Sequence, residues 1–147
     1  MTTNLPVAAA FGRGGELFVF AVGADQQILF NRRTSDGWAS TWTAVPGTAR
    51  TKHSVAACTD QTGNVLVVHT GLNGKLYHAW YTDGSWTAWE PLDDGAGSTA
   101  MPMALASGGK EIAWFLTGNN KHVYADGVRY YSADLPGSAD SARPERG

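Results

Sequence analysis

The chain repeats one pattern three times along its 147 residues, and this internal repeat limits the possible folds more than any other feature. Each copy has a glycine that is followed two residues later by Asp or Asn. These glycines, Gly23, Gly71 and Gly118, lie 48 and 47 residues apart. The copy at residues 71–92 is the most complete, and the one at residues 118–136 is partial. A period of this length is typical of supersecondary units that stack or surround an axis.

Each copy is predicted to contain four short strands. The first is rich in alanine, a poor strand former, which indicates a place where backbones approach closely. The second is a nearly continuous apolar run, as expected for a strand covered on both faces. Glycine and an Asx residue (Asp25, Asn73 or Asn120), interpreted as turn formers, then favour a tight hairpin. The predicted strands span residues 7–11, 17–22, 28–33 and 42–45 in the first copy, 55–58, 65–70, 76–81 and 89–92 in the second, and 103–106, 112–117, 123–126 and 128–131 in the third.

Four-stranded units of roughly 40 to 50 residues arranged around an axis are the blades of a β-propeller. We therefore predict an all-β propeller with three blades, at about residues 6–46, 53–92 and 101–136, followed by a disordered tail at 137–147. Propellers have about four to eight blades, so three blades cannot close a ring. A homodimer would form a six-bladed ring, whereas a trimer would exceed the usual number. The alternative is an open array with capped ends.

The charge and composition of the chain exclude several classes of partner. The formal net charge is −2, so no basic surface for nucleic acid or an anionic membrane is expected. No apolar run approaches the roughly 20 residues of a membrane helix. The start of the chain lacks the pattern of a secretory signal, which predicts a cytoplasmic protein, with non-classical export as the alternative. Cys58 is the only cysteine, so no internal disulfide can form, and we interpret it as a small core thiol.

The repeat carries a recognisable combination of glycine, Asx, leucine, histidine and tryptophan. It consists of Gly71, Asn73, Leu76, His78 and Trp80, then Gly84, Trp86, Trp89 and Leu92, and the first copy shows Gly23, Asp25, Leu29, Trp38 and Trp42. This pattern resembles the repeat of PLL-type and tachylectin-like β-propeller lectins, over about residues 6–136. The resemblance implies carbohydrate binding between adjacent blades, often of fucose, O-methylated sugars or amino sugars. It also implies self-association, because some small lectins of this kind build one ring from several short chains.

Tryptophans near the hairpin turns are the first candidates for ligand contacts. An indole offers a flat apolar face for the C–H side of a sugar and one N–H donor. Trp38 and Trp86 lie beside glycine-containing turns and are expected to reach a ligand, whereas Trp42 and Trp89 are expected to pack. The alternative for all four is a structural role in the contact between blades, because a residue that recurs in every unit can serve packing alone.

Positions at which one copy departs from the others are also informative, because a shared structural role would be met alike in all copies. His69 replaces Ala21 and Leu116 on an otherwise apolar strand. It is therefore either a residue of a pocket or a structural histidine with a buried partner. His78, Trp80 and Asp83 are further candidates for contacts with a hydroxylated ligand. Arg32 can either bind a ligand hydroxyl or extend its charged end into solvent, and Trp114 can either fill the core or line the interior of the ring as a ligand contact.

The sequence also leaves an enzyme and a scaffold open as alternatives. It contains no nucleophile elbow, phosphate loop, dinucleotide fingerprint or zinc motif, so neither a cofactor nor a metal is predicted. A cyclase or isomerase of intracellular secondary metabolism would need mainly a shaped pocket and one acid–base residue. His69, Glu90 and Glu111 are the candidates for that role. A scaffold without a small ligand is the third hypothesis.

Overall fold

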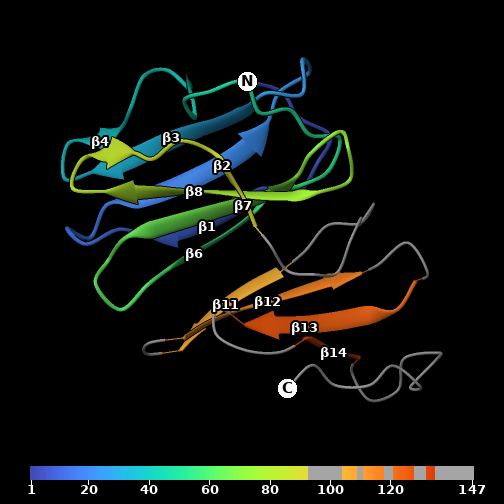
Figure 1. Ribbon diagram of the computed structural model, residues 1–147. Coiled ribbons are helices and arrows are strands. Elements are labelled where there is room, and N and C mark those ends of the chain that lie inside the picture. Colours follow the sequence, from blue (N-terminus) through green and yellow to red (C-terminus); the bar gives the residue numbers. More distant parts are fainter. Residues whose placement is uncertain (93–103, 109–110, 118–120, 128–131, 135–147) are drawn as a thin grey trace.

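The computed structural model describes residues 1–92, 104–108, 111–117, 121–127 and 132–134. Every regular element in these residues is a β-strand, and the strands form three antiparallel sheets in chain order, here called sheets 1, 2 and 3 (Figure 1). This part of the chain has no helix with the length and apolar character to cross a membrane. The predicted tail at 137–147 and the predicted strand at 128–131 lie outside the described residues.

Each sheet begins with its inner strand and adds the following strands outward along the chain. All neighbouring strands within a sheet run antiparallel, and short hairpins connect most of them. Sheet 1 consists of β1 (Ala8–Phe11), β2 (Leu17–Val22), β3 (Ile28–Thr34), β4 (Gly37–Trp38) and β5 (Thr43–Ala44), sheet 2 of β6 (Ala56–Thr59), β7 (Val65–Thr70), β8 (Leu76–Thr82), β9 (Ser85–Trp86) and β10 (Glu90–Pro91), and sheet 3 of β11 (Ala104–Gly108), β12 (Glu111–Thr117), β13 (Val123–Gly127) and β14 (Ser132–Asp134).

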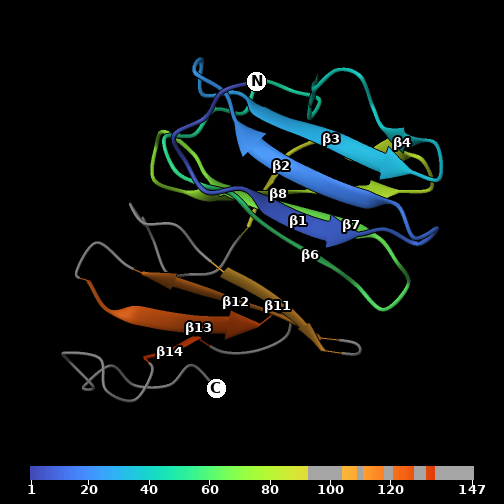
Figure 2. The same ribbon diagram turned by 180° about the vertical axis from the view of Figure 1, so that it is seen from behind.

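The inner and second strands agree closely with the sequence-based expectation. β2 and β7 have the bounds that the apolar runs predict, and all six residues of β7 are buried. Burial of every residue explains why β7 shows no alternation of apolar and polar residues. The inner strand β6 contacts both β1 and β11, and Figure 2 shows these strands from behind. Alanine therefore recurs where the sheets come together, as the sequence predicts.

The outer strand of sheets 1 and 2 differs from the expectation because it is divided into two short pieces. The sequence predicts single strands at 42–45 and 89–92, whereas the structure has β4 with β5 and β9 with β10, each two residues long. In sheet 2, Asp83 (φ 47°) and Gly84 (φ 85°) both have positive φ, as in a type I′ hairpin turn. This turn places Trp86 directly beside Tyr81. Trp86 lies on β9 and Trp38 on β4, so each tryptophan belongs to the first piece of an outer strand.

The two faces of each sheet have different roles in packing. We call the face that packs on the next sheet along the chain the leading face, and the opposite one the trailing face. Phe18 and Phe20 on the leading face of sheet 1 are fully buried, and they pack with Val65 and Val67 on the trailing face of sheet 2. The place where these faces meet is called the first seam. Its large aromatic and branched side chains form the main core of the molecule.

Sheets 2 and 3 pack in the same manner, leading face on trailing face. Leu66 and Val68 on the leading face of sheet 2 form a cluster with Ile112 on the trailing face of sheet 3. Trp114 and Leu116 from that trailing face are also buried, with exposed fractions of 6% and 3%. Trp114, which the sequence suggests as a ligand contact, therefore fills the core between sheets 2 and 3.

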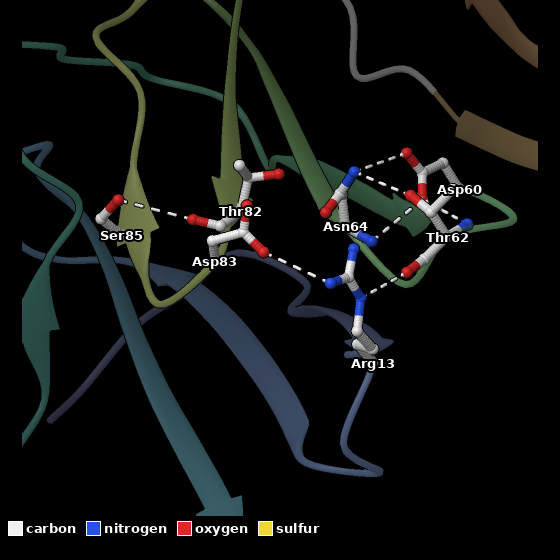
Figure 3. A network of polar contacts seen from close by, with 7 residues as sticks. All are labelled: Arg13, Asp60, Thr62, Asn64, Thr82, Asp83 and Ser85. Atoms are coloured by element: carbon white, nitrogen blue, oxygen red, sulfur yellow. Dashed lines mark hydrogen bonds and ion pairs between the residues drawn. The ribbon is translucent and has the colours of Figure 1, made fainter.

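Polar contacts between loops join sheets 1 and 2 at one end of the first seam (Figure 3). Arg13, in the β1–β2 hairpin, donates from Nε to the carbonyl oxygen of Thr62 at 2.7 Å, and its Nη1 lies 3.3 Å from Oδ1 of Asp83. Asp60 accepts hydrogen bonds from the backbone N–H groups of Thr62 and Asn64, which orders the β6–β7 hairpin. Arg13 and Asp83 are both largely exposed, so their ion pair adds little stability. The hydrogen bond from Arg13 to the carbonyl oxygen of Thr62 is therefore the stronger of the two contacts that Arg13 makes with sheet 2.

Gly63 lies in the same hairpin, close to the backbone of Arg13 in sheet 1. Its φ is +88°, and a Cβ at this position would lie 2.5 Å from Cα of Arg13. Gly15, the matching residue of sheet 1, has φ +79° but nothing within 4 Å of an added Cβ. We expect Gly15→Ala to lower the free energy of unfolding by about 1 to 2 kcal/mol through φ alone. Gly63→Ala should lower it by about 3 kcal/mol or more, because a backbone clash is added.

Urea denaturation of the two glycine variants measures this difference directly. The comparison is matched, since both substitutions place alanine in a left-handed conformation and only one meets a neighbouring sheet. Equal losses of stability would mean that sheets 1 and 2 do not approach as closely as the structure shows.

Candidate ligand-binding site

A pocket of about 810 Å³ lies at the first seam. One side is formed by residues 46–50, the segment that leads from sheet 1 to sheet 2. The other side comes from sheet 2: the end of β7, the β7–β8 hairpin, Tyr77 on β8, and residues 86–89 around the break in the outer strand. The volume falls in the range of sites that hold small organic ligands. Residues far apart in the sequence therefore meet to form one concave surface.

Three aromatic side chains, Tyr77, Trp86 and Trp89, form the apolar walls of this pocket. Trp86 packs on rings of sheet 1, including Phe30 at a centroid distance of 5.4 Å. Trp89 lies against Gly47, where an added Cβ would come within 2.9 Å of the indole Cδ1. Rings held in this way form walls before any ligand arrives, which reduces the entropy lost on binding. Their flat faces suit a ligand with an apolar side and polar groups.

His69 forms the buried side of the pocket and is only 2% exposed. The ring of Tyr77 stacks on it at 5.5 Å, and the ring of Trp89 meets it edge-on at 4.7 Å. Neither imidazole nitrogen meets the geometric criteria for a hydrogen bond to any described residue. Burial lowers the pKa of His69 to about 4, an effect that the backbone of Thr70 only partly offsets. The imidazole is therefore neutral at neutral pH.

Asn73 and Arg50 supply polar groups to the same pocket. Nδ2 of Asn73 donates to the hydroxyl of Tyr77 at 2.8 Å, while its Oδ1 accepts from the backbone N–H of Lys75 at 3.1 Å. Nη1 of Arg50 donates to the carbonyl oxygen of Ala49 at 2.9 Å, which uses one of the five guanidinium donors. Among the described residues that line the pocket, Arg50 alone has a permanent charge and none is a carboxylate. The pocket thus suits a neutral or anionic ligand better than a cation.

The stability of the protein is expected to fall between pH 6.5 and pH 4 because His69 is buried in its neutral form. The unfolded chain takes up a proton near the ordinary pKa of 6.5, whereas the folded chain does so only near 4. The contribution of neutral His69 is therefore complete above pH 6.5 and is lost as the pH falls to 4. A difference of this size in pKa corresponds to about 3 kcal/mol in the free energy of unfolding.

The variant His69→Leu isolates this effect. Its free energy of unfolding relative to the wild type should rise by about 3 kcal/mol between pH 7 and pH 4, because only the wild type loses the contribution. Burial also lowers the pKa of His78, but His78 is present in both proteins and its effect cancels. Urea denaturation at a series of pH values provides the measurement. A constant difference between the two proteins would contradict burial of a neutral imidazole.

Two of the predicted ligand contacts, His69 and Trp86, lie at the pocket. His78 and Trp80 lie on the opposite side of sheet 2, since they are paired with Val68 and Leu66 of its leading face. Trp80 packs there against the cluster shared with sheet 3. The structure therefore does not bring these two residues together with His69.

The remaining predicted contacts are also away from the pocket. Arg32 on β3 donates from Nη1 to the hydroxyl of Tyr81 at 2.8 Å, which links sheets 1 and 2. Trp38 is 51% exposed on the trailing face of sheet 1. Asp83 contacts Arg13 in the hairpin described above. These side chains contribute to the contact between sheets or to the outer surface of sheet 1.

The candidate acid–base residues of the enzyme hypothesis are not gathered at the pocket. His69 lines it, whereas Glu90 is exposed on β10 opposite His78, and Glu111 is exposed at the start of β12. Within the described ranges, no group of three or more His, Cys, Asp or Glu side chains is placed to hold a metal ion. The pocket thus offers one titratable base, whose lowered pKa makes it a weak one.

Several residues that line the pocket are not predicted from the sequence to be ligand contacts. The sequence assigns Trp89 to packing and Asn73 to a turn, and the structure shows both roles together with a place at the pocket. The sequence predicts no ligand contact at Tyr77 or Arg50. Tyr77 pairs with His69 across β7 and β8, so the hairpin register provides a signal for it. Arg50 belongs to a connecting segment, and its position depends on how two sheets pack.

Antiparallel sheets that pack face to face in succession, with their inner strands together, are the blades of a β-propeller. Sheets 1 to 3 therefore define a three-blade propeller segment with a pocket where two blades meet. No family model matches the chain, and no curated protein matches it significantly.

Solved structures of fucose-binding propeller lectins share this fold. AofleA from Arthrobotrys oligospora aligns with 99% of this chain at a TM-score of 0.66 and 10% identity, over 46% of its own length. A variant of the Aleuria aurantia lectin in complex with Fucα1-6GlcNAc aligns with 93% of this chain at a TM-score of 0.63 and 19% identity, over 47% of its own length. Another structure of the Aleuria lectin is described as a six-bladed β-propeller.

A third structural relative has a similar length to this chain. It is a fucose lectin from Kordia zhangzhouensis in complex with methyl-fucoside, with a TM-score of 0.56, 12% identity and coverage of 97% of both chains. At these identities the likeness shows the fold. The chain spans about half the length of the Aleuria lectin and of AofleA.

Proposed function

We propose that this protein is a carbohydrate-binding propeller lectin and that its ligand binds in the pocket at the first seam. The observation that carries the proposal is the composition of this pocket. Fixed aromatic rings of Tyr77, Trp86 and Trp89 stand beside uncharged and cationic polar groups, as sugar recognition requires. The structural relatives, which are fucose lectins, support the same class of ligand.

Fucosides are the first ligands to test, followed by O-methylated and N-acetylated sugars. Each of these carries a methyl group together with hydroxyl groups. The methyl group can pack against an indole face, while the hydroxyl groups bond polar side chains. The structural relatives are described with fucose-containing ligands, which places fucosides first.

A glycan array with the purified protein, followed by calorimetric titration of the sugars that bind, tests the proposal. We expect Asn73→Ala to weaken binding by about 10-fold, because Asn73 orients Tyr77 at the pocket. Asp25→Ala is the matched control, since Asp25 accepts a similar turn hydrogen bond from Gln27 in sheet 1 and lies outside this pocket. Absence of binding to all three classes of sugar, even on a multivalent surface, would contradict a lectin. Equal effects of the two substitutions would mean that the turns, and not the pocket, matter.

We also propose that a second copy of the chain completes a six-bladed ring. On the trailing face of sheet 1, Trp38 and Phe11 are 51% and 58% exposed. On the leading face of sheet 3, Ala113 and Phe115 are half-buried, and Ala104 and Ala106 are exposed. Within the chain, a leading face packs on a trailing face both between sheets 1 and 2 and between sheets 2 and 3. The free leading face of sheet 3 could therefore pack on the free trailing face of sheet 1 in a second copy.

The position of Trp38 adds support to the ring. Trp38 matches Trp86, which lies 48 residues later on the equivalent piece of outer strand. Trp86 is packed on the leading face of the preceding sheet, including Phe20 at a centroid distance of 5.8 Å. Phe115 of sheet 3 occupies the position that corresponds to Phe20. Sheet 3 of a second copy would therefore present Phe115 toward Trp38 at the contact between two chains.

A further inference from the structure

His69 is an exception within the repeat, and its surroundings make it an unfavourable residue for stability alone. The corresponding residues, Ala21 and Leu116, are apolar and have exposed fractions of 1% and 3%. His69 is equally buried at 2%, yet neither ring nitrogen makes a well-formed hydrogen bond to a described residue, and the backbone of Thr70 satisfies the imidazole only in part. A buried polar group without a good hydrogen-bond partner destabilises a fold. An apolar residue at position 69 would fill the space without this loss.

Of the seven buried side-chain nitrogen and oxygen atoms without a hydrogen-bond partner among the described residues, four belong to residues that line the pocket. They are both nitrogens of His69 and the indole nitrogens of Trp86 and Trp89, and all three residues line the same cavity. A neutral imidazole has one donor and one acceptor, and an indole has a donor only. The residues on the buried side of the pocket therefore carry one acceptor and several donors, all covered by protein atoms in the absence of a ligand. A hydroxyl group complements this set, because it donates one hydrogen bond and accepts others.

We propose that His69 is the specificity-determining residue of this pocket and that it binds a hydroxyl group of the ligand. The inference rests on the proposed lectin function and extends it to the chemical group that is recognised. The imidazole accepts the hydroxyl proton in a hydrogen bond, and the indole N–H groups beside it donate to ligand oxygen atoms. Ligands that lack the hydroxyl leave buried polar groups unpaired and are rejected, as in other sites built around a buried polar group.

This role gives each chain one pocket of this type. Ala21 and Leu116 cannot bond a hydroxyl group, so the corresponding positions of sheets 1 and 3 lack the acceptor. The three copies of the repeat thus share one fold, but only the second carries the group that recognises a ligand hydroxyl. Binding stoichiometry should accordingly be one high-affinity site per chain.

The test uses methyl α-L-fucoside and its monodeoxy analogues with three proteins: the wild type, His69→Leu and His69→Gln. Leucine is the residue that sheet 3 carries at this position, so His69→Leu should fold with unchanged or higher stability at pH 7. It should bind methyl α-L-fucoside at least about 10-fold more weakly in calorimetric titration. Glutamine keeps a donor and an acceptor, so His69→Gln should recover part of this affinity.

The deoxy analogues separate direct contact from a structural effect. One monodeoxy fucoside should bind the wild type about 10-fold more weakly than the parent sugar, yet bind His69→Leu as well as the parent does. The imidazole nitrogen-15 resonances of His69 in the wild type should also shift when methyl α-L-fucoside is added. This measurement does not depend on the folding of any variant.

The outcomes distinguish the inference from the proposed function. If the wild type binds the fucoside while its His69 resonances do not move, or if His69→Leu binds equally well, the role of His69 is wrong and the lectin function stands. If the folded wild type binds none of the fucosides or the array sugars, the proposed function fails and the inference fails with it.

Discussion

Replacement of Trp86 by alanine is expected to lower the free energy of unfolding by about 3 to 5 kcal/mol, the range for removal of a large packed aromatic side chain. The Trp86 ring meets those of Phe18, Phe20, Phe30 and Tyr81 at centroid distances between 5.3 and 6.4 Å. Three of these rings belong to sheet 1 and one to sheet 2. Trp86 therefore joins two sheets, and alanine would leave a cavity where they meet.

Urea denaturation at a fixed protein concentration measures this loss, and Leu72→Ala is the control. Leu72 lines the same pocket but is 57% exposed, so its removal should change the free energy of unfolding by less than about 0.5 kcal/mol. A loss below about 1 kcal/mol for Trp86→Ala would mean that its ring contacts contribute little to the fold. If Trp86→Ala lowers the free energy of unfolding by the expected value of about 3 to 5 kcal/mol, weaker sugar binding could result from the damaged fold, so it would not by itself identify Trp86 as a ligand contact.

The second large effect is expected at Trp38, where Trp38→Asp should convert the proposed dimer into single chains. In one chain this indole is 51% exposed, so its replacement should leave the folded chain nearly intact. In the proposed ring it packs on sheet 3 of the partner, where loss of a central tryptophan and burial of a carboxylate weaken association by at least about 100-fold. Light scattering after size-exclusion chromatography, over a range of concentrations, measures the change in mass.

Trp38→Phe serves as the matched variant, because a phenyl ring keeps an apolar contact at the same position. We expect it to remain dimeric at concentrations that dissociate Trp38→Asp. A folded wild-type protein with the mass of a single chain at all concentrations would contradict the six-bladed ring. If the wild type is dimeric and the Trp38→Asp variant stays dimeric as well, the contact between chains lies on another face.

The sequence predicts the strand order and most strand bounds because its signals for them are local. Continuous apolar runs at 17–22 and 65–70 match β2 and β7, and β7, which is covered on both faces, has all six residues buried. The divided outer strand is harder to predict. Its first piece is two residues long and depends on the turn at Asp83 and Gly84, and a run of two residues has no measurable period.

The candidate site could be predicted only in part, because it depends on contacts between sheets. His69 stands out in the sequence because it breaks the repeat, and the structure places it at the pocket. Trp86 and Trp89 are both visible as repeat residues, but only their surroundings show that both rings pack and also line the pocket. Arg50 belongs to a connecting segment with no motif, so only the packing of sheet 1 on sheet 2 reveals its position.

The divided outer strand has a consequence for the behaviour of the protein in concentrated solution. An uninterrupted edge strand exposes a row of backbone N–H and C=O groups on which another chain can add its own strand, the first step toward aggregates and fibrils. In sheets 1 and 2 this row is limited to pieces of two residues, β4 with β5 and β9 with β10. The interruption that opens space beside Trp89 therefore also protects these edges against strand addition by neighbouring molecules.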